Sequence, residues 1–534
     1  MLALLFIFIF ILNTTTAATN NLVTLSNGGA IQGGTNAEAR FWLNVPFAQP
    51  PLNELRWRKP SYPALKWNDT RDATTLGPKC LGPTVLNSKK MPSGQEDCLT
   101  LNIYAPLTAP TKLAPVVVYI PGGGFMTGNS FVGGLYNCST LTSTTNMIYV
   151  VLQYRLGAFG FLAAPGINAE NDDTIARLGI LDQRAALEFV RDNIYLFHGD
   201  KDQVTLWGES AGGGSVLLHL ALEASWHLFH RIVAESPYFS PTGMYLTPEN
   251  RWTRAKIQAN ALISSVGCGN TSNKSAAVAV TVAPPSLGNC MRSISAHTIN
   301  NLKVNQELLF EAPGANYYPV WSNDSQTPNP YGNRLRPNTS VLLGNNMNES
   351  GLLSRMLHPE MILPTSAQEL KSAVVDLWGT NRSDSILQHY NEQADGKNNR
   401  AFFAAVSDAC INCPLRRWKN RLLLSNSSAD VYQYIFDAMS IPGIGVSHTE
   451  ELPFVFDRQY MLLTKDLKVL SSQMVEMWEQ FEKSGNPNGG VLSNVTWPNS
   501  NNVSHEEDVM LFRAGKDASR VTTDLFTRCF VWQD

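Results

Sequence analysis

Ser210 lies in a setting that suits a nucleophilic hydroxyl. It is the central residue of Gly208-Glu-Ser-Ala-Gly212, directly after the apolar run from Val204 to Trp207. A strand that turns so sharply into a helix strains the serine backbone, and only glycine-sized neighbours let the adjacent chains pass. The hydroxyl then stands at a helix N-terminus, where free amides and the helix dipole stabilise the negative charge that develops in acyl transfer. The pattern predicts Ser210 as a nucleophile, although the same pattern also occurs by chance in ordinary loops.

A run of glycines follows a second apolar stretch. The β-branched and aromatic residues from Val116 to Ile120 predict a buried strand, and Pro121-Gly-Gly-Gly-Phe125 follows at once. The amides of such a loop can turn toward a nucleophile and hold an oxyanion. A flexible turn or a phosphate-binding loop would look similar. A P-loop, however, requires Lys and then Ser or Thr after its last glycine, and here the glycines end at Phe125.

An activated serine needs a histidine as base and a carboxylate that orients it. When the nucleophile sits in such an elbow, the acid and then the base follow it in the chain, which excludes only His198 among the nine histidines. His448 lies in a Gly- and Ser-rich loop after the strand-like residues 431–436, and Glu349 follows the strand-like residues 341–343 and a polar turn. Because sheets present catalytic groups on loops at strand ends, we expect Glu349 and His448 to complete the site. Three more histidines belong to the helical stretch after the serine and are expected to be packed or solvated: His219, His227 and His230.

Ordered matches over nearly the whole chain resemble the type-B carboxylesterase/lipase family, the cholinesterase-like branch of the α/β-hydrolase fold, and within it the secreted fungal esterases and lipases most of all. The resemblance implies an α/β fold with a mostly parallel central sheet and helices on both faces. It implies Ser210 as nucleophile, Glu349 as acid and His448 as general base and acid, with no cofactor and no metal. It implies oxyanion donors in the amides of Gly123, Gly124 and Ala211. The matching segments are Phe41 to Ala48, Leu55 to Trp57, Glu96 to Ile103, Pro121 to Phe125, Tyr154 to Phe161, Gly179 to Gln183, Gly208 to Gly212, Gly344 to Gly351, His448 to Phe456 and Trp478 to Asn488.

The resemblance also implies several structural pairs. Two disulfides are expected, Cys80 with Cys98 and Cys268 with Cys290, and two internal ion pairs, Arg56 with Glu96 and Arg155 with Asp182. Glu209 is expected to be a buried polar neighbour of the site and not a member of the triad. The partners of Cys138, Cys410, Cys413 and Cys529 stay open; without a second such pair, the C-x-x-C at residues 410–413 is not a zinc site.

Two departures from the family pattern lie next to the predicted site. Pro121 replaces the histidine that opens the glycine loop in many relatives, which is harmless if the donors are the backbone amides that follow. Ser350 stands where many relatives have glycine after the acid, and it creates a sequon at Asn348. A glycan at that position would block the site, so we expect Asn348 to be unmodified.

A third departure concerns the loop that the first expected disulfide closes. In the family this loop lies at the mouth of the active-site gorge, and in fungal lipases it is a long apolar lid. Here the interval from Leu81 to Asp97 is short and polar, and it contains no aromatic residue. It offers little apolar surface to an oil interface, and it lacks the tryptophan on which cholinesterases stack a quaternary ammonium. The loop therefore favours soluble esters and argues against acetylcholine.

The bulk properties agree with a secreted protein. An apolar run from Leu2 to Leu12, a polar stretch and then Ala17-Ala18 predict a signal peptide over residues 1–18, followed by one α/β domain over residues 19–534. The net charge of −3 gives no basic patch for nucleic acid and no polybasic membrane anchor. The oligomeric state cannot be inferred. Ten further sequons are consistent with a glycosylated surface: Asn68, Asn137, Asn270, Asn273, Asn323, Asn338, Asn381, Asn426, Asn494 and Asn502.

These observations favour a secreted serine carboxylic ester hydrolase that acts through an acyl-enzyme on soluble short-chain, aryl or hydroxycinnamoyl esters. A lipase or sterol esterase is the alternative within the same chemistry. A cholinesterase-like adhesion module, which keeps the fold but has lost the triad, is the alternative outside it. The filled triad positions argue against the adhesion module.

Overall fold

The computed structural model describes residues 21–82, 94–164, 166–167, 176–238, 248–269, 284–302, 335–350, 366–378, 380–393, 398–425, 429–438, 446–492, 495–501, 508–515, 519–522 and 529. The expected signal peptide lies outside these residues, as do residues 83–93 of the loop between Cys80 and Cys98.

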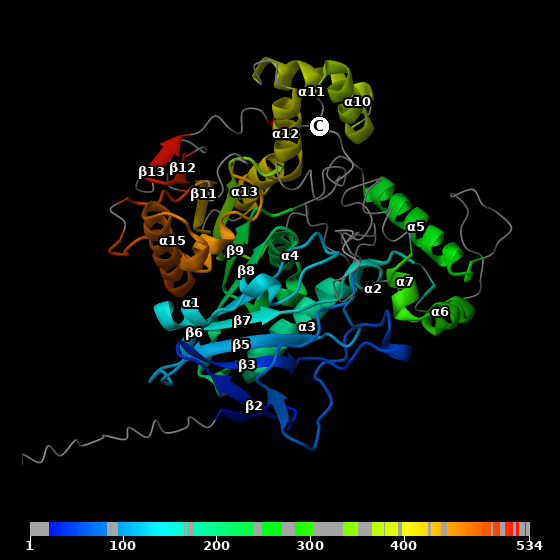
Figure 1. The fold of residues 1–534 in the computed structure, drawn as a ribbon, viewed down its shortest axis with the longest axis vertical. Helices are drawn as coiled ribbons and strands as arrows, with labels where there is room; N and C mark the ends of the chain where they lie inside the picture. Colours follow the sequence, from blue (N-terminus) through cyan, green and yellow to red (C-terminus); the bar gives the residue numbers. More distant parts are fainter. Residues whose placement is uncertain are drawn as a thin grey trace, which may run out of the picture.

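One twisted sheet organises the described chain (Figure 1). Its strand order is β1-β2-β3-β5-β7-β6-β8-β9-β10-β11-β12-β13, and β4 pairs with β2. The central strands from β7 to β12 pair in parallel, whereas β3, β5 and β13 join antiparallel. The strands are β1 Leu22–Thr24, β2 Ala30–Thr35, β3 Ala39–Pro46, β4 Arg71–Ala73, β5 Thr100–Pro106, β6 Ala114–Ile120, β7 Ile148–Leu152, β8 Gly199–Glu209, β9 Arg231–Glu235, β10 Ser340–Asn346, β11 Val431–Asp437, β12 Asp508–Arg513 and β13 Ser519–Thr522.

Helices cover both faces of this sheet. Successive residues of β6 show why: Val116, Val118 and Ile120 belong to one buried cluster, and Val117 and Tyr119 belong to another. A parallel sheet that is buried on both faces has continuous apolar strands instead of alternating ones. The α-helices are α1 Ser139–Thr145, α2 Gly157–Phe161, α3 Leu178–Asn193, α4 Ala211–Ala221, α5 Pro248–Ser265, α6 Pro284–Ser293, α7 Ala296–Asn300, α10 Ala367–Trp378, α11 Thr380–Gln393, α12 Asn398–Ser407, α13 Cys413–Ser425, α14 Leu452–Val455 and α15 Lys465–Ser484.

The helices divide between the two clusters. The first cluster contains apolar residues of α3 and α4, and the second contains those of α1, α14 and α15. Figure 1 shows α1 and α15 on one side of the central strands and α3 and α4 on the other. The predicted fold class, an α/β-hydrolase sheet with helices on both faces, is confirmed. Short 3₁₀ turns and one π-helical turn complete the chain: η1 Asn53–Leu55, η2 Val132–Gly134, η4 Ile194–Phe197, η5 Glu223–Leu228, η6 (π) Asp408–Asn412 and η7 Gln459–Met461.

Three disulfides reinforce the described chain. Cys80 pairs with Cys98 and Cys268 with Cys290, which are the pairings that the resemblance implies. The third joins Cys413 of α13 to Cys529, 116 residues further along the chain. Cys138 and Cys410 are buried free thiols. The C-x-x-C is therefore neither self-paired nor part of a pair with Cys138.

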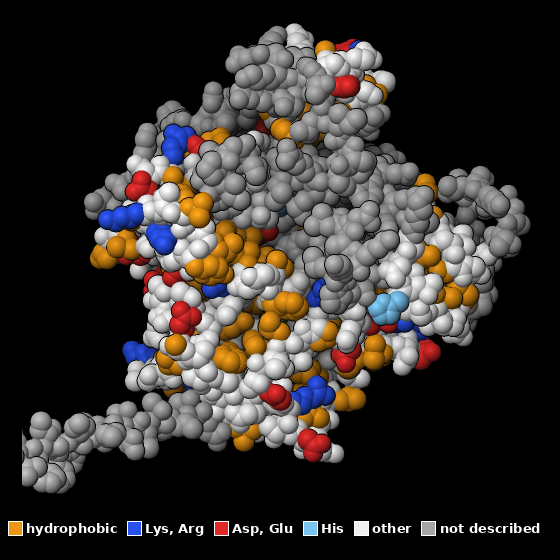
Figure 2. Space-filling model, in the orientation of Figure 1, with side chains coloured by type: hydrophobic (Ala, Val, Ile, Leu, Met, Phe, Trp, Pro, Cys, Tyr) orange, Lys and Arg blue, Asp and Glu red, His pale blue; other side chains and the backbone are white. Residues whose placement is uncertain are grey.

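Charges of both signs are interspersed among the described residues on the face that Figure 2 shows. None of the described helices is both long and apolar enough to cross a membrane.

Candidate active site

Ser210 occupies a strained turn between β8 and α4. Its φ of 57° and ψ of −124° lie outside the regions that L residues prefer, which costs of order 1–3 kcal/mol. The turn is possible because its neighbours are glycines: a Cβ on Gly212 would lie 1.9 Å from the carbonyl oxygen of Ile120, and one on Gly208 would lie 2.5 Å from the backbone of Gly212. The Ser210 amide donates to the carbonyl of Glu235 at 3.0 Å, which ties the turn to β9.

The glycine loop after β6 packs directly against this turn. A Cβ on Gly122 would lie 2.8 Å from the carbonyl oxygen of Glu209 and 3.0 Å from the Cβ of Ser210. Gly123 and Gly124 have φ values of 117° and 62°, a conformation that favours glycine. Within the described part of the chain, the amides of Gly123, Gly124 and Ala211 donate to no other group. Among the described residues, the amides for which the resemblance implies an oxyanion role therefore have no acceptor, and the loop of Gly123 and Gly124 packs through Gly122 against the turn of Ser210.

Glu349 and His448 meet from two different loops. His448 Nδ1 lies 2.7 Å from Glu349 Oε2, and both side chains are buried. The other carboxylate oxygen, Oε1, accepts hydrogen bonds from the amide of Asn346 at 2.6 Å and from the hydroxyl of Ser236 at 2.7 Å. These two donors fix the carboxylate, and the carboxylate in turn fixes the plane of the imidazole.

The second nitrogen of His448 lies beside Glu209 but forms no hydrogen bond with it. Its Nε2 lies 3.1 Å from Glu209 Oε1, whereas no hydrogen bond joins Nε2 to the hydroxyl of Ser210. Catalytic hydrogen bonds of ligand-free sites are often long and tighten only when substrate binds. The structure therefore brings Ser210, Glu349 and His448 to one place, with Nε2 of the imidazole close to the carboxyl group of Glu209.

Buried carboxyl groups surround this imidazole. Burial raises the pKa of Glu209 to about 8, against the opposing effect of His448. Burial and the nearby charge of Glu349 raise the pKa of Glu451 to about 7, and burial raises that of Glu235 well above its usual value. Burial alone would lower the pKa of His448, but the carboxylates of Glu209 and Glu349 outweigh it and raise the pKa to about 9.

Three residues of this network were not predicted from the sequence. Ser236 follows β9 with a φ of 41° and contacts Glu349 and, at 3.4 Å, Glu451. Asn346 donates through its side chain to Glu451 at 2.5 Å and to the carbonyl of Ser447 at 2.7 Å. Glu235 accepts from the indole of Trp478 at 2.9 Å. The only signal in the sequence is that Glu235, Ser236 and Asn346 end parallel strands, where such side chains converge.

A π-helical turn supports the loop that carries Glu349. Asn345 donates through its side chain to Asn412, at the end of the turn, at 3.0 Å. The amide of Ser350 donates to the hydroxyl of Ser407 at 3.0 Å, and the hydroxyl of Ser350 donates to the carbonyl of Phe403 at 2.6 Å. The departure from glycine at position 350 thus adds a part-buried hydrogen bond directly beside the predicted acid.

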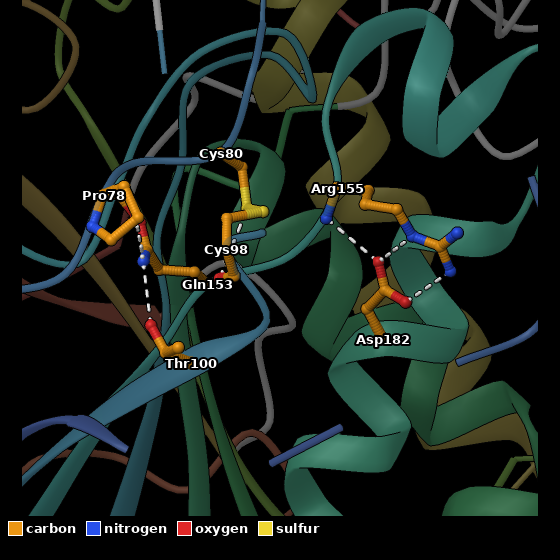
Figure 3. Close-up of a disulfide and its surroundings, with 7 residues drawn as sticks. All are labelled: Pro78, Cys80, Cys98, Thr100, Gln153, Arg155 and Asp182. Atoms are coloured by element: carbon orange, nitrogen blue, oxygen red, sulfur yellow. Dashed lines mark hydrogen bonds and ion pairs between the residues drawn. A yellow bond between two sulfur atoms is a disulfide. The ribbon is translucent and has the colours of Figure 1, made fainter. Parts of the chain in front are cut away.

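The two expected ion pairs lie around the first disulfide. Arg155 forms a two-pronged pair with buried Asp182, with N–O distances of 2.7 and 2.8 Å (Figure 3). Arg56 contacts Glu96 at 2.6 Å through each of two nitrogens. Two parallel bonds give such pairs geometric specificity, so both fix the chain segments around the disulfide of Cys80 and Cys98.

Comparison with known proteins agrees with this geometry. The sequence pattern of the Carboxylesterase family matches residues 19–529, so the chain belongs to that family and the predicted resemblance is confirmed. It is 31% identical over 494 residues to acetylcholinesterase of Bungarus fasciatus, covering 86% of this chain and 77% of that protein. It is 42% identical over 221 residues to para-nitrobenzyl esterase of Bacillus subtilis (strain 168), covering 41% of this chain and 44% of that one. It is 29% identical over 519 residues to the Crystal protein of Dictyostelium discoideum, covering 92% and 87%.

Proposed function

We propose that the protein is a serine carboxylic ester hydrolase that acts through an acyl-enzyme. The observation that carries this proposal is the convergence of the buried Glu349–His448 pair, the strained Ser210 and three free backbone amides. A binding module would need none of these features. Ester hydrolases among the relatives, by their printed names, support the same reading.

In the proposed mechanism Ser210 Oγ attacks the ester carbonyl while His448 Nε2 accepts the hydroxyl proton. The oxyanion of the tetrahedral intermediate accepts hydrogen bonds from the amides of Gly123, Gly124 and Ala211. The intermediate collapses, the bond to the alkoxy oxygen breaks, and His448 gives its proton to the departing alcohol. Water then attacks the acyl-enzyme with His448 as base, which releases the acid and restores Ser210.

No hydrogen bond joins His448 Nε2 to Ser210, so the imidazole must shift toward the hydroxyl for the first proton transfer. Glu349 acts through Nδ1, so the hydrogen bond to this carboxylate can serve as the pivot. A negative charge on Glu209 favours the imidazolium, which cannot accept the proton of Ser210, so the charge of Glu209 affects the pH at which the neutral base forms. Glu209 is therefore a neighbour that tunes the base, not a third acid.

The decisive test is Ser210→Ala in the purified protein, assayed with p-nitrophenyl acetate. We expect a loss of roughly three or more powers of ten, as triad knockouts give, with unchanged thermal unfolding because the hydroxyl packs against nothing large. Wild-type rates in a normally folded variant would refute the proposal and favour the binding-module alternative.

We further propose that the substrates are soluble short-chain, aryl or hydroxycinnamoyl esters. The polar composition of Leu81 to Asp97 supports this choice, and so does the likeness to a para-nitrobenzyl esterase. A panel of p-nitrophenyl esters of rising chain length, methyl ferulate, emulsified triglyceride, a steryl ester and acetylthiocholine separates the options. Preference for triglyceride or steryl ester would favour the lipase alternative, and rapid acetylthiocholine turnover would contradict the argument from the missing tryptophan.

Secretion and glycosylation belong to the same proposal. Three disulfides suit an oxidising compartment, and sequon residues Asn68, Asn137 and Asn338 are exposed. Expression in a eukaryotic host should deliver the protein to the medium, with a mass that falls on treatment with an N-glycosidase. Retention inside the cells, without a cleaved leader, would contradict secretion.

A further inference from the structure

A chain of buried hydrogen bonds leads from η5 to the first residue of α4. The hydroxyl of Ser225 lies 2.9 Å from His219 Nδ1, and His219 Nε2 lies 3.1 Å from Gln183 Oε1. The side-chain nitrogen of Gln183 donates to the hydroxyl of Ser215 at 3.0 Å, and that hydroxyl donates to the carbonyl of Ala211 at 2.9 Å. All four polar side chains are fully buried. The chain therefore joins η5, α3 and α4 directly behind the predicted nucleophile.

The last acceptor fixes the direction of every bond in this chain. A backbone carbonyl can only accept, so the single hydroxyl proton of Ser215 points to Ala211 and its oxygen accepts from Gln183. The oxygen of the Gln183 amide then faces His219, which must donate through Nε2. The other ring nitrogen, Nδ1, accepts from Ser225. Burial lowers the pKa of His219 to about 3, so the ring stays neutral, as this arrangement requires.

The first turn of α4 depends on support from outside. Residues 212–214 are three consecutive glycines, and glycine loses more conformational entropy in a helix than other residues do. The tight packing of the turn explains the glycines: a Cβ on Gly212 would lie 1.9 Å from the carbonyl oxygen of Ile120, and one on Gly213 would lie 2.7 Å from that of Glu235. The turn therefore has no side chains of its own to hold it in place.

The amide of Ala211, which the proposed mechanism uses, belongs to this turn. It shares one trans peptide group with the carbonyl of Ser210, so the N–H points away from that carbonyl. The Ser210 carbonyl accepts from the amides of Gly214 at 2.8 Å and Tyr238 at 3.0 Å. The next carbonyl, that of Ala211 itself, accepts from the hydroxyl of Ser215. A serine bond to the carbonyl four residues earlier adjusts the local bend of a helix, so Ser215 acts on the residue that carries the oxyanion donor.

The rest of the chain keeps the Ser215 hydroxyl in this direction. Because Gln183 donates to the hydroxyl oxygen, the hydroxyl proton has no competing acceptor there and stays on the carbonyl of Ala211. None of the four polar side chains leaves a buried polar atom without a partner. Fully satisfied buried networks are rigid and specify a single arrangement.

We propose that Ser215 is a positioning residue for the oxyanion hole, and that the one-way chain through His219 and Gln183 holds its hydroxyl on the carbonyl of Ala211. The proposal rests on the proposed ester hydrolysis, because its effect is on the Ala211 amide. Without the hydroxyl the glycine-rich turn relaxes and the Ala211 N–H loses its direction. The transition state then loses stabilisation that the bound ester does not use.

The test compares Ser215→Ala with Ser225→Ala. Each variant removes one fully buried hydroxyl of the chain, but Ser225→Ala leaves the three bonds from His219 to Ala211 in place. The readouts are kcat and KM for p-nitrophenyl acetate and the inhibition constant of an aliphatic trifluoromethyl ketone, whose adduct with Ser210 carries an oxyanion. For Ser215→Ala we expect kcat to fall about tenfold, part of the 10²–10³ that a lost oxyanion donor costs. We expect KM to stay within about twofold and ketone affinity to weaken by the same factor as kcat.

Ser225→Ala should keep wild-type kcat and ketone affinity even if its melting temperature falls. Unchanged ketone affinity in Ser215→Ala, or an equal loss in both variants, would overturn the proposal.

A second measurement applies even if Ser215→Ala does not fold. Nitrogen NMR of the histidine side chains in the wild type reports the tautomer of His219, whose signals are identified by their change in Ser225→Ala. A neutral ring protonated on Nε2 supports the proposal, and a ring protonated on Nδ1, or on both nitrogens, overturns it. Ester hydrolysis that survives Ser210→Ala would refute the proposed function instead, so the two failures are distinguishable.

Discussion

Glu209 Oε1 lies 3.1 Å from His448 Nε2, the nitrogen that faces away from Glu349. The imidazole thus lies between two carboxyl groups: Nδ1 is hydrogen-bonded to Glu349, and Nε2 is close to Glu209 without a hydrogen bond. The residue directly before the predicted nucleophile thereby controls the predicted base, because a negative charge on Glu209 favours the imidazolium. Catalysis requires the neutral imidazole, so this contact couples activity to pH.

Glu209→Gln should move the rising limb of kcat/KM to lower pH. The substitution removes a charge that raises the pKa of His448 toward 9, so the neutral imidazole forms at lower pH. We expect a shift of about one pH unit or more, given the energy of a charge pair at this distance. A pH profile of the hydrolysis of a soluble p-nitrophenyl ester measures it. If the rising limb of kcat/KM in Glu209→Gln lay at the wild-type pH, or at higher pH, Glu209 would not set the pKa of His448.

Glu349→Gln and Glu451→Gln separate the predicted acid from its neighbour. The two carboxylates lie in one network, but only Glu349 contacts His448 Nδ1. Glutamine at position 349 keeps the shape but loses the charge that stabilises the imidazolium, so kcat should fall by about 10³ or more. Glutamine at position 451 should cost less than about tenfold, because it lacks contact with the imidazole. The reverse order of severity in steady-state assays would mean that the acid is misassigned.

Local sequence patterns predict several features of the site, including the buried strand before the glycine loop and the sharp turn at Ser210. The buried strand from Val116 to Ile120 follows from its continuous apolar residues, whereas the sheet with helices on both faces was implied by the family resemblance. The elbow follows from the glycines at positions 208 and 212, because only small residues fit where the structure brings the backbones of Ile120 and Gly212 together. Such constraints lie within a few residues, so a single sequence reveals them.

Contacts between distant segments could not be predicted in the same way. Nothing near Cys413 indicates that it pairs with Cys529, and the sequence therefore left several partners open. The contacts of Ser236 with Glu349 and of Asn346 with Glu451 join three loops, and each residue alone resembles a solvated strand end. The proximity of His448 Nε2 to Glu209 depends on packing in three dimensions, although both residues were identified beforehand.

Ser350→Gly should destabilise the protein more than it impairs catalysis. The change removes the part-buried hydrogen bond to the carbonyl of Phe403, worth about 1 kcal/mol, and adds the backbone entropy of glycine to the unfolded chain. The hydrogen bond from the backbone amide of Ser350 to the hydroxyl of Ser407 remains, so the loop that carries Glu349 keeps its position. We therefore expect kcat to stay within about threefold. Thermal unfolding and steady-state assays measure the two effects.

Asn348→Gln is the matched control for that substitution. It removes the same sequon but leaves the hydroxyl of Ser350, whose side chain is buried in the fold. Equal mass in Asn348→Gln and wild type, apart from the residue difference itself, would agree with an unmodified Asn348. If Asn348→Gln lowered the melting temperature as much as Ser350→Gly, the effect would belong to the sequon and not to the hydrogen bond.

The last prediction concerns substrate at an interface. A lipase gains rate at an oil surface because an apolar lid opens onto it, exposing a patch that is costly in water but stable against lipid. The interval from Leu81 to Asp97 has Leu81, Val85, Leu86 and Met91 as its sizeable apolar residues, and it carries Lys89, Lys90, Glu96 and Asp97. A loop of this composition gains little from contact with oil. We expect a hyperbolic rate curve for a short-chain ester up to and beyond its solubility limit, without an upward break. A sharp rise as the ester forms an emulsion would favour the lipase alternative. The double variant Lys89→Leu/Lys90→Leu provides the control, because added apolar surface at these positions should introduce the break if this loop governs the response to an interface.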